Sequence, residues 1–262
     1  MYPPIADVFE VVGPTRLLEG QTVMVTGAAG GIGRVLTHVL AVAGARLAIT
    51  DVDDPALTKV ATDLSALSEV RSEVFDATDA DRFAAFSERV AKTYGSIDGL
   101  VNCTGLWASA PFEELDSSAW EMVVTANVTT TFVACHAVAP AMVRQGRGSI
   151  VNFASTAGEY GSITPAAHYA ASKGAVIALT KSLARELSPY NVRVNALSPG
   201  PIDTPSLTGG ATSQQRAAIG ARTLFGRMGE PHEVAGACAF LLSPLATFIT
   251  GHVLRVNGGS LL

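Results

Sequence analysis

Thr26-Gly27-Ala28-Ala29-Gly30-Gly31-Ile32-Gly33 is the stretch of sequence that decides the fold. The β-branched and apolar run 22–26 predicts a buried strand that leads into it, and the apolar periodicity over 35–43 predicts a helix that follows. Glycines between a strand and a helix allow close backbone approach, and the helix start offers N–H groups and a positive dipole end to a phosphate. A lone glycine cluster is equally often a simple tight turn, so the stretch alone indicates a pyrophosphate site only weakly.

An acidic residue strengthens the indication of a dinucleotide site. The run 46–50 predicts a second strand, which ends on Asp51, about 20 residues beyond the glycines. A carboxylate at that point is placed to accept hydrogen bonds from the adenosine ribose hydroxyls of NAD, whereas it would repel the 2′-phosphate of NADP. Gly30 and Val52 carry no charge that would offset this repulsion. The cofactor is therefore predicted to be NAD.

A second constellation lies in the centre of the chain. Tyr169 and Lys173 are four residues apart, a spacing that places both on one face of a helix, and Ser155 lies fourteen residues upstream of the tyrosine. A phenol holds its proton until about pH 10, but a neighbouring cation lowers that pKa. The pair is thus suited to proton exchange with an alcohol or carbonyl oxygen, although the spacing alone also fits a solvated helix face.

Taken together, these residues resemble the short-chain dehydrogenase/reductase family over about residues 20–258. Residues 26–33 match its Thr-Gly-x-x-x-Gly-x-Gly motif, and Asn102-Cys103-Thr104-Gly105 stands where the family usually has Asn-Asn-Ala-Gly. Further matches are the stretches 198–204, 226–231 and 256–259, in the last of which Asn257 replaces a frequent aspartate. The four members of the family's catalytic tetrad are matched by Asn127, Ser155, Tyr169 and Lys173.

The resemblance implies a role for each of these positions. Tyr169 would be the general acid/base, Ser155 would steady the substrate oxygen, and Lys173 would lower the pKa of Tyr169 and hold the nicotinamide ribose. Asn127 would anchor a proton-relaying water. The implied cofactor contacts are Gly27, Gly31, Ile32, Gly33, Asp51, Asp76, Ala77, Asn102, Gly105, Tyr169, Lys173, Pro199, Gly200, Ile202 and Thr204.

The order of predicted elements indicates a doubly wound α/β Rossmann fold, a seven-stranded parallel sheet with helices on both faces. The predicted strands are 22–26, 46–50, 71–75, 97–102, 149–153, 192–197 and 253–256, with long helices over about 117–145 and 165–187. We expect an N-terminal extension over 1–19 and a single domain over 20–262. Ligands of such sheets bind beyond the carboxyl ends of the strands, where the candidate site residues fall.

Substrate contacts are less clearly indicated. The segment 205–224 is small and polar at its start, with a short helix predicted near Ala217, and it could close over the substrate as a mobile lid. Trp107, Tyr160, Ser155 and Tyr169 are the candidate substrate residues, with Glu159 beside them; ordinary loop packing explains Trp107, Tyr160 and Glu159 equally well. His168 and the arginines of the segment, Arg216 and Arg222, are expected at the surface, the histidine there or in an interface.

Composition bounds the remaining possibilities. The 262 residues are 48% hydrophobic and 16% charged with a net charge of -5, which argues against a nucleic-acid binder. Three cysteines without paired spacing indicate free thiols and no metal site. No run of 18 apolar residues indicates a membrane span, and residues 1–19 lack the features of a signal peptide, so we expect a cytoplasmic protein.

The predicted function is that of an NAD-dependent oxidoreductase acting on a secondary alcohol or ketone. The alternatives are an NADPH-dependent 3-oxoacyl or ketone reductase and, third, a dinucleotide-sensing protein without turnover. By resemblance we expect a homotetramer that pairs the helices 117–145 and 165–187. The residues expected to supply apolar contact there are Ala126, Val133, Ala134, Ala137, Ala175, Val176 and Leu179.

Overall fold

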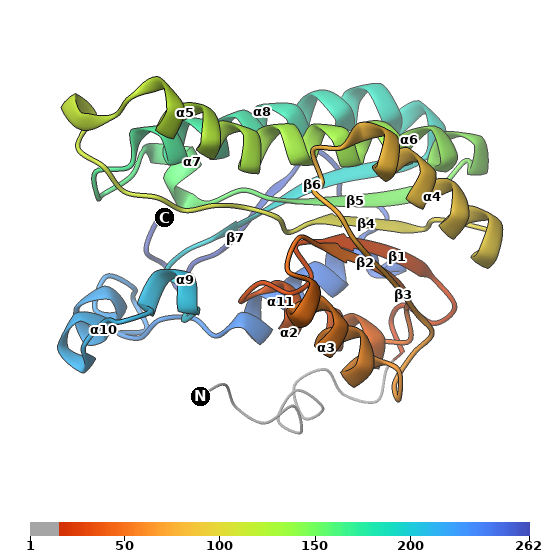
Figure 1. Cartoon of the computed structure of the whole chain (residues 1–262), viewed down its shortest axis with the longest axis horizontal. Coiled ribbons are helices and arrows are strands. Elements are labelled where there is room, and N and C mark those ends of the chain that lie inside the picture. Colours follow the sequence, from red (N-terminus) through yellow and green to blue (C-terminus); the bar gives the residue numbers. More distant parts are fainter. Residues whose placement is uncertain (1–15) are drawn as a thin grey trace.

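A computed structural model describes residues 16–262, and its centre is a seven-stranded sheet in the order β3-β2-β1-β4-β5-β6-β7 (Figure 1). Every neighbouring pair of strands is parallel. The strands are β1 (Thr22–Thr26), β2 (Arg46–Asp51), β3 (Val70–Val74), β4 (Gly99–Asn102), β5 (Gly148–Phe153), β6 (Val192–Pro199) and β7 (Val253–Val256). This is the doubly wound Rossmann arrangement that the sequence predicts.

The central strands are apolar because both of their faces are covered. Every residue of β1 and β4 is buried, whereas the edge strand β3 carries exposed Arg71 and Ser72. In a parallel sheet with helices on both faces, each strand must be hydrophobic on both sides, which accounts for the near-continuous runs of apolar residues. The pattern of burial therefore follows from the position of each strand in the sheet.

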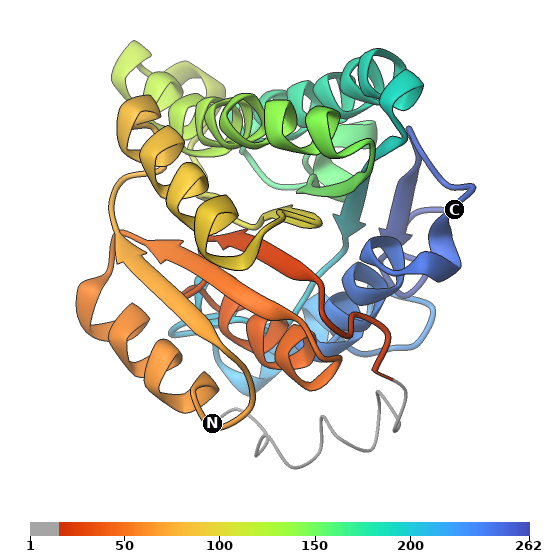
Figure 2. The same ribbon diagram turned by 90° about the vertical axis from the view of Figure 1, so that its right-hand side faces the viewer.

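Helices form a layer on each face of the sheet (Figures 1 and 2). One layer contains α2 (Gly33–Val42), α3 (Asp54–Leu64) and α11 (Pro231–Leu242). The other contains α4 (Ala80–Tyr94), α5 (Ser117–Val124), α6 (Thr130–Gln145), α7 (Thr156–Tyr160) and α8 (Ala167–Leu187). Two large clusters of buried side chains, one on each face, hold the layers to the sheet.

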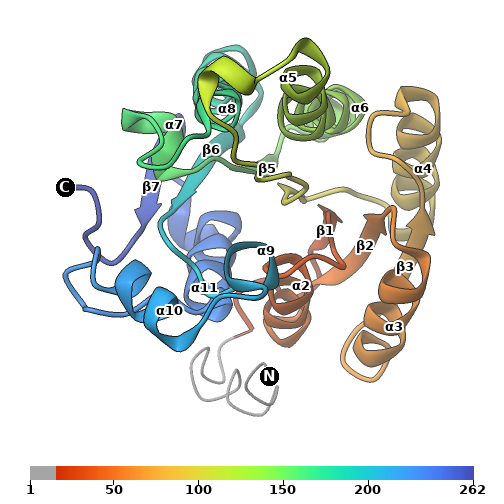
Figure 3. The same cartoon turned by 60° about the vertical axis from the view of Figure 1, so that its left-hand side comes forward.

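The binding edge of the sheet is set by the chain's path. From β1 the chain moves outward to β2 and β3, and then crosses back to β4 on the other side of β1. The loops after β1 and β4 therefore leave the sheet in opposite directions and leave a crevice between them, at the carboxyl ends of the strands. Two short helices, α9 (Pro205–Thr208) and α10 (Ser213–Gly220), lie outside the sheet on the side of α2 and α11 (Figures 1 and 3).

Two element boundaries differ from expectation for local reasons. The fourth strand begins at Gly99 instead of residue 97, because Ile97 bonds through its backbone to the side chain of Gln145 and Asp98 turns its carboxylate to Thr22 N. The long helix expected over 117–145 is continuous but contains a π-helical segment, η2 (Thr125–Thr129), between α5 and α6. The backbone hydrogen bonds of a π-helical segment join residues five apart instead of four, so the helix is locally wider there.

The start of the domain lies slightly earlier than expected. Leu18 is fully buried and its N–H donates to Ala43 O at 2.8 Å, so the core already includes part of the expected extension. Residues 1–15 of that extension lie outside the described residues. Within 16–262, the stretch Ser117–Gln145 is long and apolar enough to cross a membrane by length and composition alone. Some 44% of its most apolar window is buried in the molecule, and core helices of soluble proteins pass the same test.

Candidate active site

The glycine turn after β1 has the tight geometry of a phosphate cradle. Gly27 has φ +65°, and a Cβ there would lie 2.7 Å from Thr104 N. A Cβ on Gly33 would lie 1.9 Å from Gly27 O, so neither position tolerates a side chain. No side chain caps the N-terminus of α2 at Ile32. The N-terminus of α2 therefore has backbone N–H groups without side-chain partners, and the glycines before it leave space for a ligand. This combination fits the pyrophosphate of a dinucleotide.

A cavity of about 280 Å³ continues from this turn along the carboxyl edge of the sheet. Its wall includes Asp51, Val52, Asp76 and Ala77 at one end and Gly105 at the other. The carboxylate of Asp51 is oriented by backbone donors, since Oδ2 accepts Ala29 N at 2.9 Å and Oδ1 accepts Val52 N at 2.8 Å. Asp76 accepts Thr78 N and Oγ1 and so shapes its own turn. The cavity has the residues expected for an adenosine pocket.

The segment after β6 approaches the glycine turn from the other side. Thr204 is 9% exposed, and a Cβ on Gly31 would lie 3.0 Å from the Thr204 Cβ. Gly200 donates through its N–H to Val256 O at 3.0 Å, and a Cβ there would clash with Asn257. The side chain of Ile202 is buried. The stretch 199–204 thus lies over the turn, as expected of a segment that closes on the nicotinamide half of a dinucleotide.

Ser155, Tyr169 and Lys173 come together at the end of β5. Ser155 is the N-cap of α7, where its Oγ accepts Ala157 N at 3.2 Å, and its side chain is hydrogen-bonded to that of Tyr169. Lys173, one turn along α8 from Tyr169, has its Nζ 5.9 Å from the centre of the tyrosine ring and donates to Phe153 O at 2.7 Å. The three predicted side chains therefore form one cluster.

Burial has the largest effect on the electrostatics of this cluster. Burial raises the pKa of Tyr169 above its usual value, and the hydrogen bond from Ser155 only partly offsets this. Burial also lowers the pKa of Lys173, to about 8. That Lys173 depresses the pKa of Tyr169 stays a prediction, because in the protein alone burial has the larger effect on the phenol and raises its pKa. Tyr169 is consequently a phenol at neutral pH.

Asn127 lies in the π-helical segment and connects the loop after β4 with helix α8. Its Oδ1 accepts Leu106 N at 2.9 Å, and its Nδ2 donates to Leu106 O and to Ser172 Oγ, each at 3.0 Å. A Cβ on Gly105 would lie 2.9 Å from Asn127 Oδ1 and 3.2 Å from Lys173 Nζ. Asn127 therefore fixes the loop after β4 against α8; that it also anchors a water remains a prediction.

Several side chains point elsewhere than the sequence suggests. Asn102, expected at the cofactor, is 1% exposed and directs its amide into the core, where Nδ2 donates to Asn152 Oδ1 at 2.8 Å. His168 is 1% exposed and is not at the surface. Arg216, expected to be solvated, forms an ion pair with Asp203. For Asn102 and Arg216, a contact with a residue elsewhere in the sequence decides the orientation.

The mouth of the site is formed by two loops that are tied together. Ala110 N and Ser109 Oγ both donate to Pro165 O, at 2.8 and 2.7 Å. Trp107, on the first of these loops, is 40% exposed, and Tyr160, the last residue of α7, is 45% exposed. Both candidates for substrate contact are therefore accessible beside the cluster.

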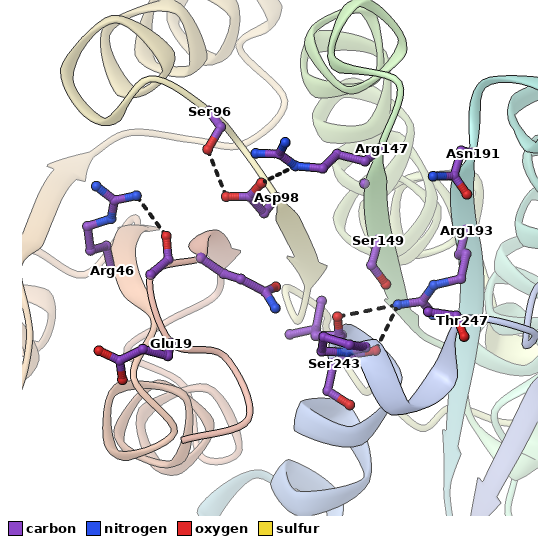
Figure 4. A pocket seen from close by; sticks show the side chains of 15 residues that line it. Glu19, Arg46, Ser96, Asp98, Arg147, Ser149, Asn191, Arg193, Ser243 and Thr247 are labelled. Carbon is purple, nitrogen blue, oxygen red and sulfur yellow. Dashed lines mark hydrogen bonds and ion pairs between the residues drawn. The ribbon is translucent and has the colours of Figure 1, made fainter. Parts of the chain in front are cut away.

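Another cavity, larger than the one beside the glycine turn, lies away from this site (Figure 4). It measures about 470 Å³ and opens at the amino ends of β1, β4, β5 and β6. Arg193 in its wall donates to Leu241 O at 2.7 Å and Leu242 O at 3.3 Å, which caps the C-terminus of α11. Arg147 is paired with Asp98 at 3.1 Å. These arginines hold elements together, and no predicted catalytic residue lines this cavity.

Sequence reasoning missed several partners of the site. Ser172, whose hydroxyl holds Asn127, and the carbonyl of Phe153, which accepts Lys173, belong to it. Arg255 is a third, since it pairs with Glu159 beside Ser155 at 2.7 Å. Ser172 is adjacent to Lys173 and could have been suspected, but no local signal marks Arg255 on β7.

Comparison with known proteins agrees with this geometry over nearly the whole chain. A family model described as Enoyl-(Acyl carrier protein) reductase matches residues 27–260. The chain is 37% identical over 243 residues to the 3-oxoacyl-[acyl-carrier-protein] reductase of Thermotoga maritima, covering 92% of this chain and 98% of the relative. It is 38% identical over 247 residues to a galactitol 2-dehydrogenase (L-tagatose-forming) of Cereibacter sphaeroides, covering 92% and 95%.

A third relative and a solved structure extend the comparison. The cis-4-hydroxycyclohexanecarboxylate dehydrogenase of Sinomonas cyclohexanicum is 39% identical over 241 residues, covering 90% of this chain and 94% of the relative. The crystal structure of gox2181 superposes with a TM-score of 0.88 at 34% identity, covering 94% of this chain and 97% of that one. The chain therefore belongs to the short-chain dehydrogenase/reductase family of oxidoreductases, which use a nicotinamide cofactor and act on CH–OH groups.

Proposed function

We propose that this protein is an NAD(H)-dependent oxidoreductase that interconverts a secondary alcohol and a ketone, with Tyr169 as its general acid/base. The observation that carries the proposal is the cluster of Ser155, Tyr169 and Lys173, in which Lys173 Nζ lies next to Gly105 in the wall of the cavity that begins at the glycine turn. A nicotinamide cofactor bound along that cavity would supply the hydride acceptor or donor. The protein would supply orientation and proton transfer.

Tyr169 exchanges the proton at the substrate oxygen. Its raised pKa makes it a ready proton donor to a carbonyl, while alcohol oxidation needs the phenolate and is favoured at higher pH. Ser155, hydrogen-bonded to the same phenol, orients the substrate oxygen. Lys173 is held by Phe153 O and would bind the nicotinamide ribose of the cofactor, and its positive charge would favour the phenolate once substrate is bound.

The preference for NAD(H) over NADP(H) rests on Asp51 and Val52. Asp51 is fixed by three backbone N–H groups at the end of β2, so that its carboxylate cannot easily turn away from the ribose. Val52 is 66% exposed and offers no cation to a 2′-phosphate. Repulsion between two anions across this pocket opposes NADP.

The test is an assay of secondary alcohols and ketones with both cofactors. The alcohols are galactitol, cis-4-hydroxycyclohexanecarboxylate, cyclohexanol and 2-octanol, and the ketones are cyclohexanone and acetoacetyl-CoA, each followed by NAD(P)H absorbance. The proposal expects turnover of at least one alcohol with NAD⁺. Absence of turnover with every compound and both cofactors, by protein that binds NADH, would favour the dinucleotide-sensing alternative.

A second candidate function is the NADPH-dependent reduction of a 3-oxoacyl group. Its support is the similarity to the Thermotoga maritima reductase over 92% of the chain. Acetoacetyl-CoA with NADPH is its probe in the same assay. A higher kcat/KM for this pair than for any alcohol with NAD⁺ would select it.

A further inference from the structure

The carboxylate of Glu159 connects three elements around the active site. Ser198 Oγ donates to its Oε1 at 2.6 Å, and Arg255 donates from Nε at 2.8 Å and from its terminal nitrogen at 2.7 Å to its Oε2. The Glu159 side chain is 14% exposed, so these bonds are largely shielded from water. Although burial raises the pKa of Glu159, the bonds from Arg255 and Ser198 lower it by more, which keeps the group ionised. Charge-assisted bonds of this kind are stronger than neutral ones.

Each partner of Glu159 stands next to a part of the catalytic machinery. Glu159 lies in α7, whose N-cap is Ser155. Ser198 directly precedes Pro199, where the segment that lies over the glycine turn begins. Arg255 belongs to β7, the last strand of the sheet. The Glu159 carboxylate therefore connects α7, which carries Ser155 at its N-terminus, and the beginning of the 199–204 segment to strand β7.

Helix α7 needs such an anchor because it has only five residues. A helix of this length does not hold its shape by its own hydrogen bonds. A second contact comes from Gly158, where a Cβ would lie 2.5 Å from the carbonyl carbon of Lys173. The helix is thus held against α8 by Gly158 and against β6 and β7 by Glu159, and Ser155 is its N-cap.

We propose that Glu159 is a positioning residue, whose carboxylate fixes Ser155 and the 199–204 segment at a constant separation. The substrate oxygen site on Ser155 and the nicotinamide side of the crevice then keep the geometry that hydride transfer requires, which is sensitive to displacements of about 1 Å. The bonds of the Glu159 carboxylate go to Ser198 and Arg255, and its role is therefore to hold other elements in place. This role rests on the proposed function, and neither Glu159 nor Arg255 is part of the motifs that identify the family.

The first measurement is independent of any substrate. Amide hydrogen exchange is compared between the wild-type protein, Glu159→Ala and Glu73→Ala, a control that removes another ion-paired carboxylate, on the edge strand β3. We expect the amides of Ala157 and Gly161 and those of 202–204 to exchange at least tenfold faster in Glu159→Ala only. Unchanged exchange in these residues would overturn the proposal, whether or not a substrate had been found.

The second measurement uses the alcohol of the panel that the wild-type protein oxidises fastest with NAD⁺. We expect Glu159→Ala to lower kcat at least tenfold, and Arg255→Ala about threefold because the bond from Ser198 remains. Glu159→Gln keeps an acceptor for Ser198 and should fall between them. It also covers the case in which Glu159→Ala does not fold.

A double mutant separates positioning from general damage. If Glu159 acts through Ser155, adding Glu159→Ala to Ser155→Ala lowers kcat less than twofold further. A tenfold further loss, or retention of more than half of the wild-type kcat by both Glu159→Ala and Glu159→Gln, would contradict the proposal. If the wild-type protein turns over nothing, the proposed function fails while the exchange measurement still decides the role of Glu159.

Discussion

Asp51 is the residue on which cofactor choice depends. Its carboxylate is held in place by backbone donors, and the adjacent Val52 is exposed. We expect kcat/KM with NAD⁺ to exceed that with NADP⁺ at least tenfold, which requires about 1.4 kcal/mol of discrimination. The double variant Asp51→Ser with Val52→Arg removes the repulsion and adds a cation, and it should narrow or reverse the ratio. The comparison of kcat/KM for both cofactors checks this; an unmodified protein that prefers NADP⁺ would refute it.

The charge of Lys173 is expected to be needed for catalysis, but its burial lowers the stability of the folded protein. Its pKa falls from about 10.5 when unfolded to about 8, so the folded state disfavours its charge. The resulting loss of stability is fully present below pH 8 and is relieved as the pH rises from about 8 to 10.5. We expect Lys173→Met to raise the free energy of unfolding by about 1–2 kcal/mol at pH 7, after the loss of the bond to Phe153 O is counted.

The measurement for Lys173 is chemical denaturation at pH 7 and at pH 10.5. The advantage of Lys173→Met should be present at the lower pH and shrink toward zero or below at the higher one, while turnover is lost at both. Equal stability of the two proteins at pH 7 would show that the ammonium is not penalised by burial.

At the scale of elements, the close contact between α7 and α8 depends on a glycine. A Cβ on Gly158 would lie 2.5 Å from backbone atoms of Lys173, and backbone cannot move aside as a side chain can. We expect Gly158→Ala to separate the two helices, lower kcat at least tenfold and destabilise the fold by about 1–3 kcal/mol. Gly236 in α11 is the matched control, since a Cβ there meets nothing within 4 Å. Gly236→Ala should be neutral or stabilising by up to about 1 kcal/mol in denaturation experiments.

Sequence patterns predict elements well here because the sheet is buried on both faces. The apolar runs of β1, β5 and β6 and the glycine turn before α2 are local signals, and the structure places each where expected. The π-helical segment at Thr125–Thr129 has no such signal. It places Asn127 between Leu106 and Ser172, a result of tertiary contacts that a periodic pattern does not contain.

The part of the candidate site that depends on local sequence patterns could be predicted, and the part that depends on contacts between remote elements could not. The convergence of the Ser155, Tyr169 and Lys173 side chains could be predicted, because the strand and helix that carry them have clear sequence patterns and Tyr169 and Lys173 are spaced by one helical turn. The orientation of Asn102 and the pairing of Glu159 with Arg255 join strands and helices remote in sequence. The pKa of Tyr169 depends on how deeply the fold buries it, which spacing does not reveal.

At the scale of the whole molecule, we propose that the protein is a homotetramer, and the structure changes which residues would form its interfaces. Val133, Ala134 and Val176, expected there, are buried in the protomer's own core. The outward face of the helix over 117–145 instead presents Trp120 and Phe132, with exposed fractions of 40% and 52%. Exposed aromatic residues on a long helix are typical of a surface that another protomer covers.

Light scattering at micromolar concentration tests the assembly. We expect four times the monomer mass for the wild-type protein and a smaller assembly for Phe132→Glu, because a buried charge opposes the helix contact. Leu67→Glu, at a 39% exposed position before the edge strand β3, is the control and should leave the mass unchanged. A wild-type protein of monomer mass would exclude the tetramer.

The most direct test of the proposed chemistry is the turnover of Tyr169→Phe. The phenol is the group of the cluster suited to proton exchange with the substrate oxygen, and loss of a general acid/base costs about 10² to 10⁴ in rate. We measure kcat for the best secondary alcohol with NAD⁺, and the Kd of NADH by fluorescence, in the variant and the wild-type protein. The account predicts a loss of kcat of at least a hundredfold with the Kd changed less than threefold. Retention of more than about a tenth of the wild-type kcat would show that Tyr169 is not the general acid/base.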